Sequence, residues 1–405
     1  MSRITSKSAR ACLLAICGAM PFVAKAVDPY WDINNPGTIT SYTFQFPMVA
    51  KSGILYLPLT YQTLHISQWE FGYGYSDLGQ LYPVGDVGGW VNSMCIHGAY
   101  IYVAGYFTML ISGGVTATNI AAYDSVGKVW TAVGDGTLTD EIWAVAVDSN
   151  GRVYVGAGDD NDHGASTSHL LRYWSGSAWT TAGAGMYGSA TDLYGYGKVT
   201  ALAANGTDVY AAGNFDSGVN ANSTVVYSTN IIKFDGSSWH AMGTPAGNGV
   251  VVAPNSESTF KKVVVSGTNV FVTGTFQNSG PSAPVGLDRF SVNCSHVQSY
   301  ILSLTSDNAW GNDLSARNGI VYLAGRFDHI DSTAVTGVAQ WRGGWSALGS
   351  GVNAQCYVAA ADADDCEPGD MVFVWGDFDH AGGYALPNGS PVRWIPETIG
   401  QDCGS

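Results

Sequence analysis

The chain has 405 residues, of which 46% are hydrophobic and 12% aromatic, while only 12% are charged. Such a composition can bury a large core and excludes an intrinsically disordered chain, and 17 Lys plus Arg beside 52 Gly and 22 Tyr favour strands and turns over exposed helices. The formal net charge of −15 argues against nucleic acid or an anionic membrane surface as a partner, since both are bound through Lys and Arg.

The first 26 residues have the organisation of a secretory signal peptide. Basic side chains open the segment, residues 11–23 are mostly apolar, and Ala24-Lys25-Ala26 supplies the small-x-small pattern of a cleavage site. The apolar stretch is shorter than the roughly 20 residues that span a membrane. We therefore expect a mature chain of residues 27–405, without direct membrane insertion, that is secreted, exposed at the cell surface or, in a bacterium, located in the periplasm.

A unit of about 50 residues recurs along the mature chain. Its most regular landmark is an aromatic residue in the second strand of each unit. Seven copies are found, at Tyr56, Tyr102, Tyr154, Tyr210, Phe271, Tyr322 and Phe373. Their spacings of 46, 52, 56, 61, 51 and 51 residues indicate one repeated structural unit.

Two further motifs keep the same register. Gly-x-Phe follows the aromatic in five copies, as in Gly213-Asn214-Phe215, and Trp-x-x-x-Gly begins the fourth strand of several copies, as at Trp239 to Gly243. Each unit thus offers four short strands, and seven such units predict one all-β domain over residues 27–405, a seven-bladed β-propeller. We expect the recurring Trp and Phe side chains to pack between blades.

The two ends of the chain predict how the ring closes. The last unit has no Trp-x-x-x-Gly after Pro396, so its fourth strand is missing. The segment Trp31 to Asn35 precedes the first unit and belongs to none, and we expect it to complete the last blade, with the segment around Tyr42 to Phe46 as the alternative donor.

These repeats resemble the propellers of secreted and cell-surface proteins. The likeness lies in the Tyr-x-x-Gly-x-Phe and Asn-Ile-x-x-x-Asp-Gly-x-x-Trp-x-x-x-Gly elements. Similar repeats occur in bacterial exported propellers and in the ectodomains of fungal cortical polarity markers, and more distantly in kelch and galactose-oxidase propellers. The resemblance implies the fold, and because the matching residues are scaffold it implies no chemistry.

Acidic loops after the second strands are the candidate metal site. The carboxylates predicted to coordinate a metal, together with one imidazole, are Asp160, Asp162, His163, Asp328 and Asp379. Oxygen ligands favour calcium, and His329 and His380 beside the last two aspartates would suit a transition ion or a ligand site. The alternative is that these short polar residues serve their own turns.

An aromatic loop and a cysteine pair complete the candidate sites. Tyr187, Tyr194 and Tyr196 lie among Gly and Ser and would make an adaptable contact surface, or else would pack on the next blade. Cys356 and Cys366 flank an Asp-rich segment of nine residues, and we expect them to form a disulfide in an oxidising compartment.

These features favour a binding or adhesion module whose partner is carbohydrate or a cell-surface protein. No nucleophile elbow or phosphate loop is present, so an enzyme is the less favoured reading. The alternatives are an extracellular metal-assisted hydrolase or polysaccharide-cleaving enzyme that uses the acidic Asp/His loops, and a structural component of an envelope or matrix.

Overall fold

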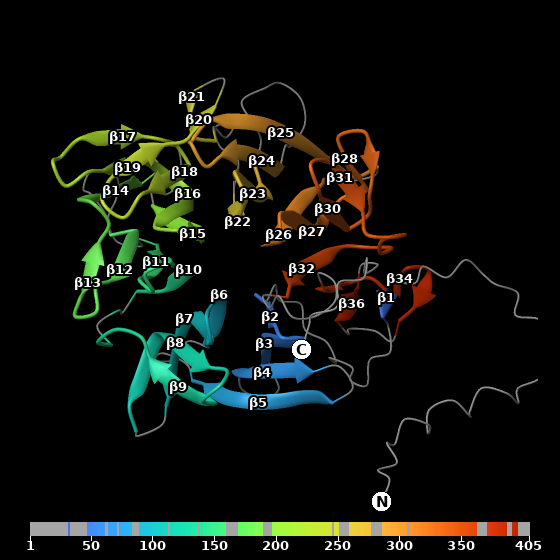
Figure 1. The fold of residues 1–405 in the computed structure, drawn as a ribbon, viewed down its shortest axis with the longest axis horizontal. Coiled ribbons are helices and arrows are strands. Elements are labelled where there is room, and N and C mark those ends of the chain that lie inside the picture. The colour runs from blue at the N-terminus through green and yellow to red at the C-terminus, as the bar shows by residue number, and fades with distance from the viewer. Residues whose placement is uncertain are drawn as a thin grey trace, which may run out of the picture.

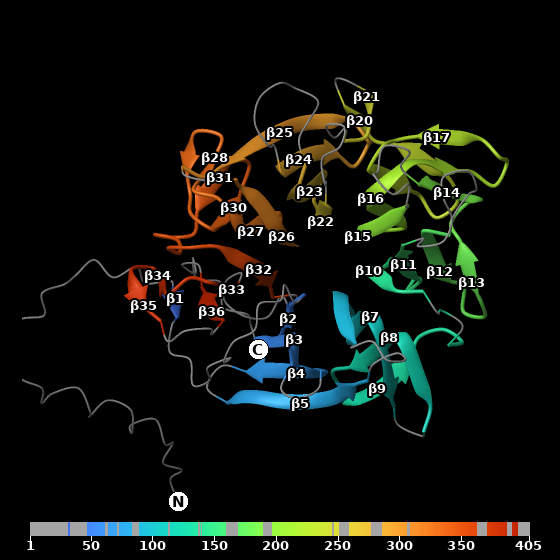
Figure 2. The ribbon, with the colours of Figure 1, turned by 180° about the vertical axis from the view of Figure 1, so that it is seen from behind.

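The computed structural model describes residues 31–32, 47–60, 64–70, 73–82, 89–111, 114–136, 138, 140–158, 169–188, 197–244, 247–250, 259–276, 286–305, 308–362, 371–386 and 391–395. Every regular element in this part of the chain is a β-strand, and the sheets form a ring around a central opening (Figures 1 and 2). None of the described residues lies in a helix that is long and apolar enough to cross a membrane. The predicted signal peptide, residues 1–26, lies outside the described residues.

Seven four-stranded antiparallel sheets, one for each repeat, are the blades of the ring. Their strands, from the centre outwards, are β2 (Val49–Lys51), β3 (Ile54–Thr60), β4 (Leu64–Glu70) and β5 (Gly74–Leu81) in blade one; β6 (Trp90–His97), β7 (Tyr100–Leu110), β8 (Thr116–Asp124) and β9 (Val129–Ala132) in blade two; β10 (Ile142–Val147), β11 (Val153–Ala157), β12 (Leu171–Trp174) and β13 (Trp179–Thr181) in blade three; β15 (Lys198–Asn205), β16 (Asp208–Val219), β18 (Ile231–Phe234) and β19 (Trp239–Ala241) in blade four; β22 (Thr259–Ser266), β23 (Asn269–Thr275), β24 (Gly286–Ser291) and β25 (His296–Ser303) in blade five; β26 (Trp310–Arg317), β27 (Ile320–Arg326), β30 (Val338–Trp341) and β31 (Trp345–Ala347) in blade six; and β32 (Cys356–Ala361), β33 (Val372–Gly376), β36 (Val392–Trp394) and β1 (Trp31–Asp32) in blade seven. The predicted seven-bladed propeller is confirmed.

Short additional strands extend some blades. Two of them lengthen blade four, where they pair with the end of β16, and the others form small hairpins. They are β14 (Gly185–Gly188), β17 (Val225–Tyr227), β20 (Gly243–Thr244), β21 (Gly247–Asn248), β28 (His329–Ile330), β29 (Thr333–Ala334), β34 (His380–Ala381) and β35 (Tyr384–Ala385).

A β-bulge at the same place in the innermost strand explains the Gly-x-Phe motif. In β15, Val199 pairs with Gly213 and Ala201 with Ala212, so Thr200 is the extra residue. A Cβ on Gly213 would lie 2.0 Å from the carbonyl oxygen of Lys198, which only glycine allows. The same close approach occurs at Gly105, Gly274, Gly325 and Gly376. The equivalent bulged residues are Asn92, Trp143, Lys261, Asn312 and Tyr357.

The Trp-x-x-x-Gly motif joins neighbouring blades at three places. Trp239 of blade four lies against Gly183 at the end of blade three, where a Cβ would be 2.7 Å from the indole Nε1. Trp179 packs on Gly134 in the same way, and Trp130 packs on Gly79. The predicted packing of tryptophans between blades is confirmed for these side chains.

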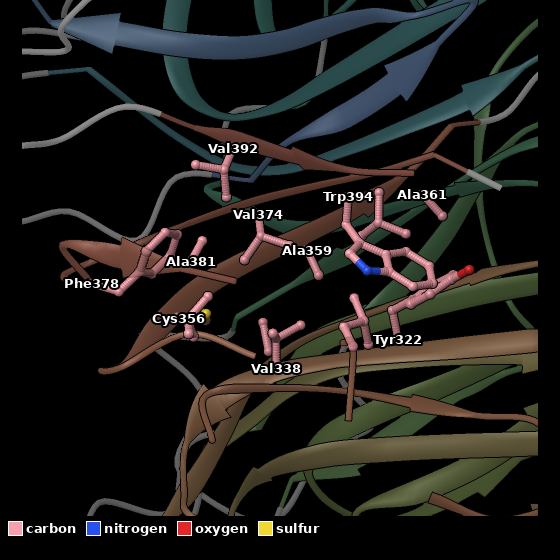
Figure 3. Close-up of a cluster of buried hydrophobic side chains, with 14 of the residues drawn as sticks. Tyr322, Val338, Cys356, Ala359, Ala361, Val374, Phe378, Ala381, Val392 and Trp394 are labelled. Atoms are coloured by element: carbon pink, nitrogen blue, oxygen red, sulfur yellow. The ribbon is translucent and has the colours of Figure 1, made fainter. Parts of the chain in front are cut away.

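The core lies between the blades rather than at the centre of the ring. Figure 3 shows the cluster between blades six and seven, in which Tyr322 and Val338 of one blade meet Ala359, Val374 and Trp394 of the other. Each of these side chains is less than 5% exposed. Because every blade buries both faces in this way, a sheet of four short strands is stable in the ring although it would not be stable alone.

The ring is closed by the predicted N-terminal strand. β1 pairs antiparallel with β36, with Trp31 opposite Trp394 and Asp32 opposite Arg393, so it supplies the missing outer strand of blade seven. The alternative donor around Tyr42 to Phe46 lies outside the described residues.

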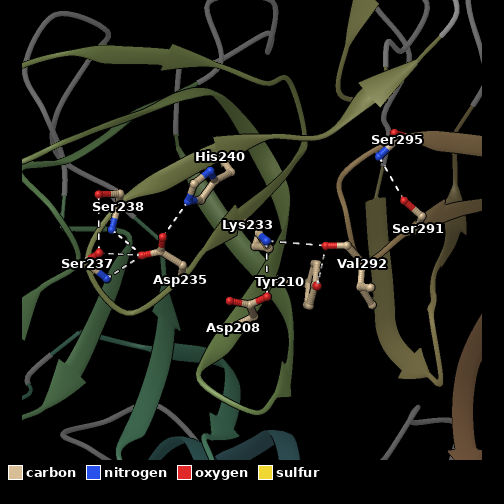
Figure 4. Close-up of polar contacts among 10 residues, drawn as sticks. All are labelled: Asp208, Tyr210, Lys233, Asp235, Ser237, Ser238, His240, Ser291, Val292 and Ser295. Carbon is tan, nitrogen blue, oxygen red and sulfur yellow. Dashed lines mark hydrogen bonds and ion pairs between the residues drawn. The ribbon is translucent and has the colours of Figure 1, made fainter.

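Contacts between blades also occupy the end of the ring away from the bulges. There the backbone carbonyl of Val292 in blade five accepts hydrogen bonds from Tyr210 Oη at 3.3 Å and Lys233 Nζ at 3.5 Å, both in blade four (Figure 4). At the joint of blades seven and one, the buried Asp362 carboxylate accepts a hydrogen bond from the Ser52 amide at 2.9 Å. We call this end the locked face and the opposite end, where the innermost strands begin, the mouth face.

Candidate functional site

The repeats differ most in chemistry at the mouth face. Three positions of each blade meet there: the start of the innermost strand, the bulged residue, and the residue after the glycine of the second strand. The glycine recurs in five blades and the buried aromatic in all seven, whereas these positions carry different side chains, several of them large, polar or aromatic and half-buried. We define the mouth ring as Trp90, Tyr106, Trp143, Lys198, Trp310, Arg326 and Tyr357.

The aromatic side chains of the mouth ring are held by cations and by each other. Lys198 Nζ lies 3.5 Å from the centre of the Trp143 ring, and Arg326 Cζ lies 4.9 Å from that of Trp310. The Trp90 and Tyr106 rings are 5.1 Å apart, centre to centre. Such contacts fix the rings before any ligand arrives, which reduces the entropy lost on binding.

Hydrogen bonds across the joint of blades two and three give the ring further rigidity. Glu141 Oε1 accepts a hydrogen bond from the indole Nε1 of Trp90 at 2.6 Å and another from Asn92 Nδ2 at 2.7 Å. On blade seven the hydroxyl of Tyr357 donates to the Asp377 carboxylate. Burial, together with this bond to a carboxylate, raises the pKa of Tyr357 to about 12, so its hydroxyl stays protonated and remains a donor.

The seven innermost strands enclose a central channel. The channel has a volume of about 300 Å³, and all seven innermost strands contribute to its wall. Most of the wall is Ala, Val, Leu and Met, with polar side chains at intervals. The surface that the wall exposes to the channel is nevertheless more polar than apolar.

The predicted site residues Asp328 and His329 are hydrogen-bonded to each other, and Asp328 is also bonded to Thr305. Asp328 Oδ2 accepts hydrogen bonds from the backbone amide and the hydroxyl of Thr305, and Oδ1 lies 2.8 Å from Nδ1 of His329. Partial burial opposes ionisation, but the hydrogen bonds from Thr305 and His329 outweigh it and lower the pKa of Asp328 to about 2. Thr305 lies in the connection from blade five to blade six, so this pair fastens that connection.

Asp379 and His380 make the equivalent contacts in blade seven. Asp379 Oδ1 lies 2.6 Å from His380 Nδ1 and 2.6 Å from Asn353 Nδ2, and Asn353 belongs to the connection from blade six to blade seven. The hydrogen bond from His380, followed by that from Asn353, lowers the pKa of Asp379. In both pairs the described contacts are those of turn residues.

The remaining predicted metal ligands are Asp160, Asp162 and His163, and they lie outside the described residues. Within the described part of the chain, no three or more His, Cys, Asp or Glu side chains are grouped so as to hold a metal ion. Asp328 and Asp379 are described, and each is hydrogen-bonded to its own neighbours, Asp328 to Thr305 and His329 and Asp379 to Asn353 and His380.

Tyr187 lies in the extension of blade four. It pairs with Ser217 of β16, whose other neighbour is Tyr227 of β17, so the three side chains share one face of a small sheet. Tyr187 is half-buried and Tyr227 is 70% exposed. Tyr194 and Tyr196 lie outside the described residues.

The predicted disulfide is not formed in the structure, where Cys356 is a free, buried thiol. Cys356 opens strand β32 and packs in the cluster between blades six and seven. The prediction took the segment between the two cysteines as a turn, whereas it continues as a strand to Ala361. Cys366 lies outside the described residues.

Sequence reasoning missed the mouth ring, although the repeat contained a signal for it. Aligning the copies on the conserved glycine places Tyr106, Asn214, Thr275, Arg326 and Asp377 at one position. A position that varies beside an unvarying glycine is a candidate for function, but only the structure shows that the bulge brings it to the channel mouth.

Comparison with known proteins adds little to this description. A scan against protein families finds no match, and a search of curated proteins finds no relative. Three solved structures are similar over most of their own length: the computationally designed Ika8 protein (12% identity, TM-score 0.45, covering 89% of this chain and 98% of that one), YCF48 bound to D1 peptide (11%, 0.48, 92% and 97%) and YjhT (10%, 0.39, 76% and 98%). The assignment of the propeller fold therefore rests on the seven sheets themselves.

Proposed function

We propose that this protein is a secreted or cell-surface binding module that recognises carbohydrate through the mouth ring. The observation that carries the proposal is the gathering of varied, preformed aromatic and polar side chains at one face of an otherwise repetitive scaffold. Aromatic faces stack on the apolar faces of sugars, the neighbouring Lys198 and Arg326 can donate hydrogen bonds to hydroxyl oxygens, and Tyr357 Oη can accept one.

Export is part of the same proposal. It is supported by the signal-peptide pattern of residues 1–26 and by the resemblance of the repeats to those of secreted and cell-surface propellers. A low content of charged residues with many Gly, Ser, Thr and Tyr is consistent with a chain that works outside the cell.

The second candidate partner is a surface protein. The mouth ring is composed largely of Trp, Tyr and Arg, the residues that dominate the binding energy of protein interfaces. If no glycan on an array binds the protein, a surface protein becomes the favoured partner.

The test is binding of the mature chain, residues 27–405, to a glycan array, with calcium and again with EDTA because the acidic segment Asp160 to His163 remains a calcium candidate. We expect Trp310→Ala to weaken binding at least about tenfold, the effect of a side chain worth about 1.4 kcal/mol. Tyr100→Ala is the matched control, because Tyr100 is an exposed aromatic at the turn on the locked face. If Tyr100→Ala weakens binding and Trp310→Ala does not, the site is not the mouth ring.

A further inference from the structure

The central channel carries an unusual concentration of positive charge for this protein. Among the residues that line it, the charged ones are Lys261, Lys262 and Asp313. The whole chain has 17 Lys plus Arg against 32 Asp plus Glu, yet the channel wall contains two lysines and one aspartate. The charge of the channel is therefore opposite in sign to that of the molecule.

A β-bulge in β22 falls at the two neighbouring lysines. In β22, Phe260 pairs with Gly274 and Lys262 with Thr273, which leaves Lys261 as the extra residue. In a regular strand adjacent side chains point to opposite faces, whereas a bulge redirects one of them. Lys261 and Lys262 are both half-buried, and both are among the residues that line the channel.

Asp313 balances only part of this charge. Its Oδ1 lies 3.6 Å from Lys262 Nζ, and its Oδ2 accepts a hydrogen bond from the Ala359 amide at 3.3 Å. Burial raises the pKa of Asp313 although Lys262 opposes the change, and burial lowers the pKa of Lys261. Both directions indicate an environment poor in water, where an opposite charge interacts more strongly than it would at the surface.

Lys262 also acts across the channel. Desolvation raises the pKa of the half-buried Cys95 thiol to about 12, and the charge of Lys262 opposes this rise. Cys95 belongs to β6, and Figure 1 shows β6 and β22 on opposite sides of the central opening. The ammonium group of Lys262 therefore influences the interior of the channel and not only its own wall.

Two serines on other strands of the channel wall, Ser93 of β6 and Ser315 of β26, can complete a polar site. Ser93 Oγ accepts a hydrogen bond from the Val145 amide at 3.2 Å, and Ser315 Oγ accepts one from the Ala361 amide at 2.9 Å. Because each oxygen acts as the acceptor, its hydroxyl hydrogen is able to donate. Both residues line the channel.

We propose that the channel binds the carboxylate of a small acidic ligand, with Lys261 and Lys262 as the cationic groups and with Ser93 and Ser315 as neutral donors. This inference rests on the proposed function, from which it takes the mouth face as the side where the ligand enters. It adds the chemical class of the ligand, a small carboxylic acid. The cavity of about 300 Å³ is at the lower end of the range for small-molecule sites, which fits one acidic sugar or one terminal amino acid.

The test is isothermal titration calorimetry of the mature chain, residues 27–405, at low salt with glucuronate, N-acetylglutamate and neutral glucose. We expect at least one acid to bind and glucose not to bind. Glucuronate alone would identify an acidic sugar as the source of the carboxylate, and N-acetylglutamate alone would identify a peptide end. Glucose binding as tightly as the acids, or no binding of either acid into the millimolar range, would overturn the proposal.

Two lysine variants make the test specific. Lys262→Gln should weaken binding of the acid at least about tenfold, and Lys128→Gln, in an exposed turn, should leave it unchanged. Because Lys262→Gln strips Asp313 of its partner and can affect folding, Lys261→Gln provides a second variant that keeps that ion pair. Unchanged affinity in both channel variants would contradict the proposal. The assay does not use the glycan array, so acid binding by a protein that binds no glycan would leave this site standing while the carbohydrate proposal fails.

Discussion

Single glycines of the second strands lie against the bulge in five blades, whereas blade three has Ala157 at this position. Gly213 faces the carbonyl oxygen of Lys198 with no room for a Cβ, at a distance of 2.0 Å. Gly213→Ala should therefore lower the free energy of unfolding by about 1–3 kcal/mol, the usual effect of overpacking. Gly344→Ala is the control, since nothing lies within 4 Å of its added Cβ, and it should change stability by less than about 0.5 kcal/mol. Urea unfolding of both variants measures the difference, and equal stability would mean that β15 can shift to make room.

Individual residues also show where sequence reasoning reaches its limit. The motif placed Asp328 and Asp379 correctly at equivalent positions after the second strand. It could not show that their partners are Thr305 and Asn353, which precede them by 23 and 26 residues and lie in the connections between blades. Contacts of this kind depend on how one blade is seated against the next, which no motif of a single repeat encodes.

At the scale of elements, a strand of only two residues closes the ring. β1 has two residues, yet its pairing with β36 joins the beginning of the described chain to its last blade. The sequence predicted this strand because one repeat lacked a fourth strand and one segment belonged to no repeat. Counting the strands of each repeat was sufficient to predict β1, because a strand pairs with a sheet edge through backbone hydrogen bonds, which do not require a particular side-chain motif.

A chain that begins at residue 36 should therefore unfold at a lower temperature than one that begins at residue 27. Without β1, strand β36 becomes an unpaired edge, and such edges pair with other chains. We expect a lower thermal midpoint and a concentration-dependent increase in size on gel filtration. A synthetic peptide of residues 27–35, added in excess, should restore part of the midpoint, whereas a scrambled peptide should not. An unchanged midpoint in the short chain would show that the strand is dispensable.

At the scale of the whole molecule, the same ring separates a conserved scaffold from a variable face. Periodicity was enough to predict seven blades, since buried aromatics and glycines must recur wherever a blade packs on its neighbour. The channel and the mouth ring could not be predicted from the sequence, because Trp90, Lys262 and Tyr357 are far apart in the chain and approach one centre only when the ring closes. A site built from several blades forms only in the closed ring, so the sequence of a single repeat does not reveal it.

Acid should weaken the ring at the joints between blades. The pKa of Asp328 is lowered to about 2 and that of Asp379 is also lowered, so in the folded protein both carboxylates hold their charge to lower pH than in the unfolded chain. The unfolded state then binds more protons as the pH falls, and the contribution of these groups to stability, complete above about pH 4, is lost on the way to about pH 2.

The pH dependence of the thermal midpoint, compared between the natural protein and Asp328→Asn, tests this linkage. We expect the variant to be less stable above about pH 4, because its amide cannot accept from Thr305 and His329 as a carboxylate does, and we expect the difference to shrink toward pH 2. Thr305→Val, which removes one donor and keeps the carboxylate, should show the same convergence with a smaller difference. If the gap between the natural protein and Asp328→Asn stays constant from pH 6 to pH 2, then Asp328 contributes through packing and its charge is not what fastens blade five to blade six.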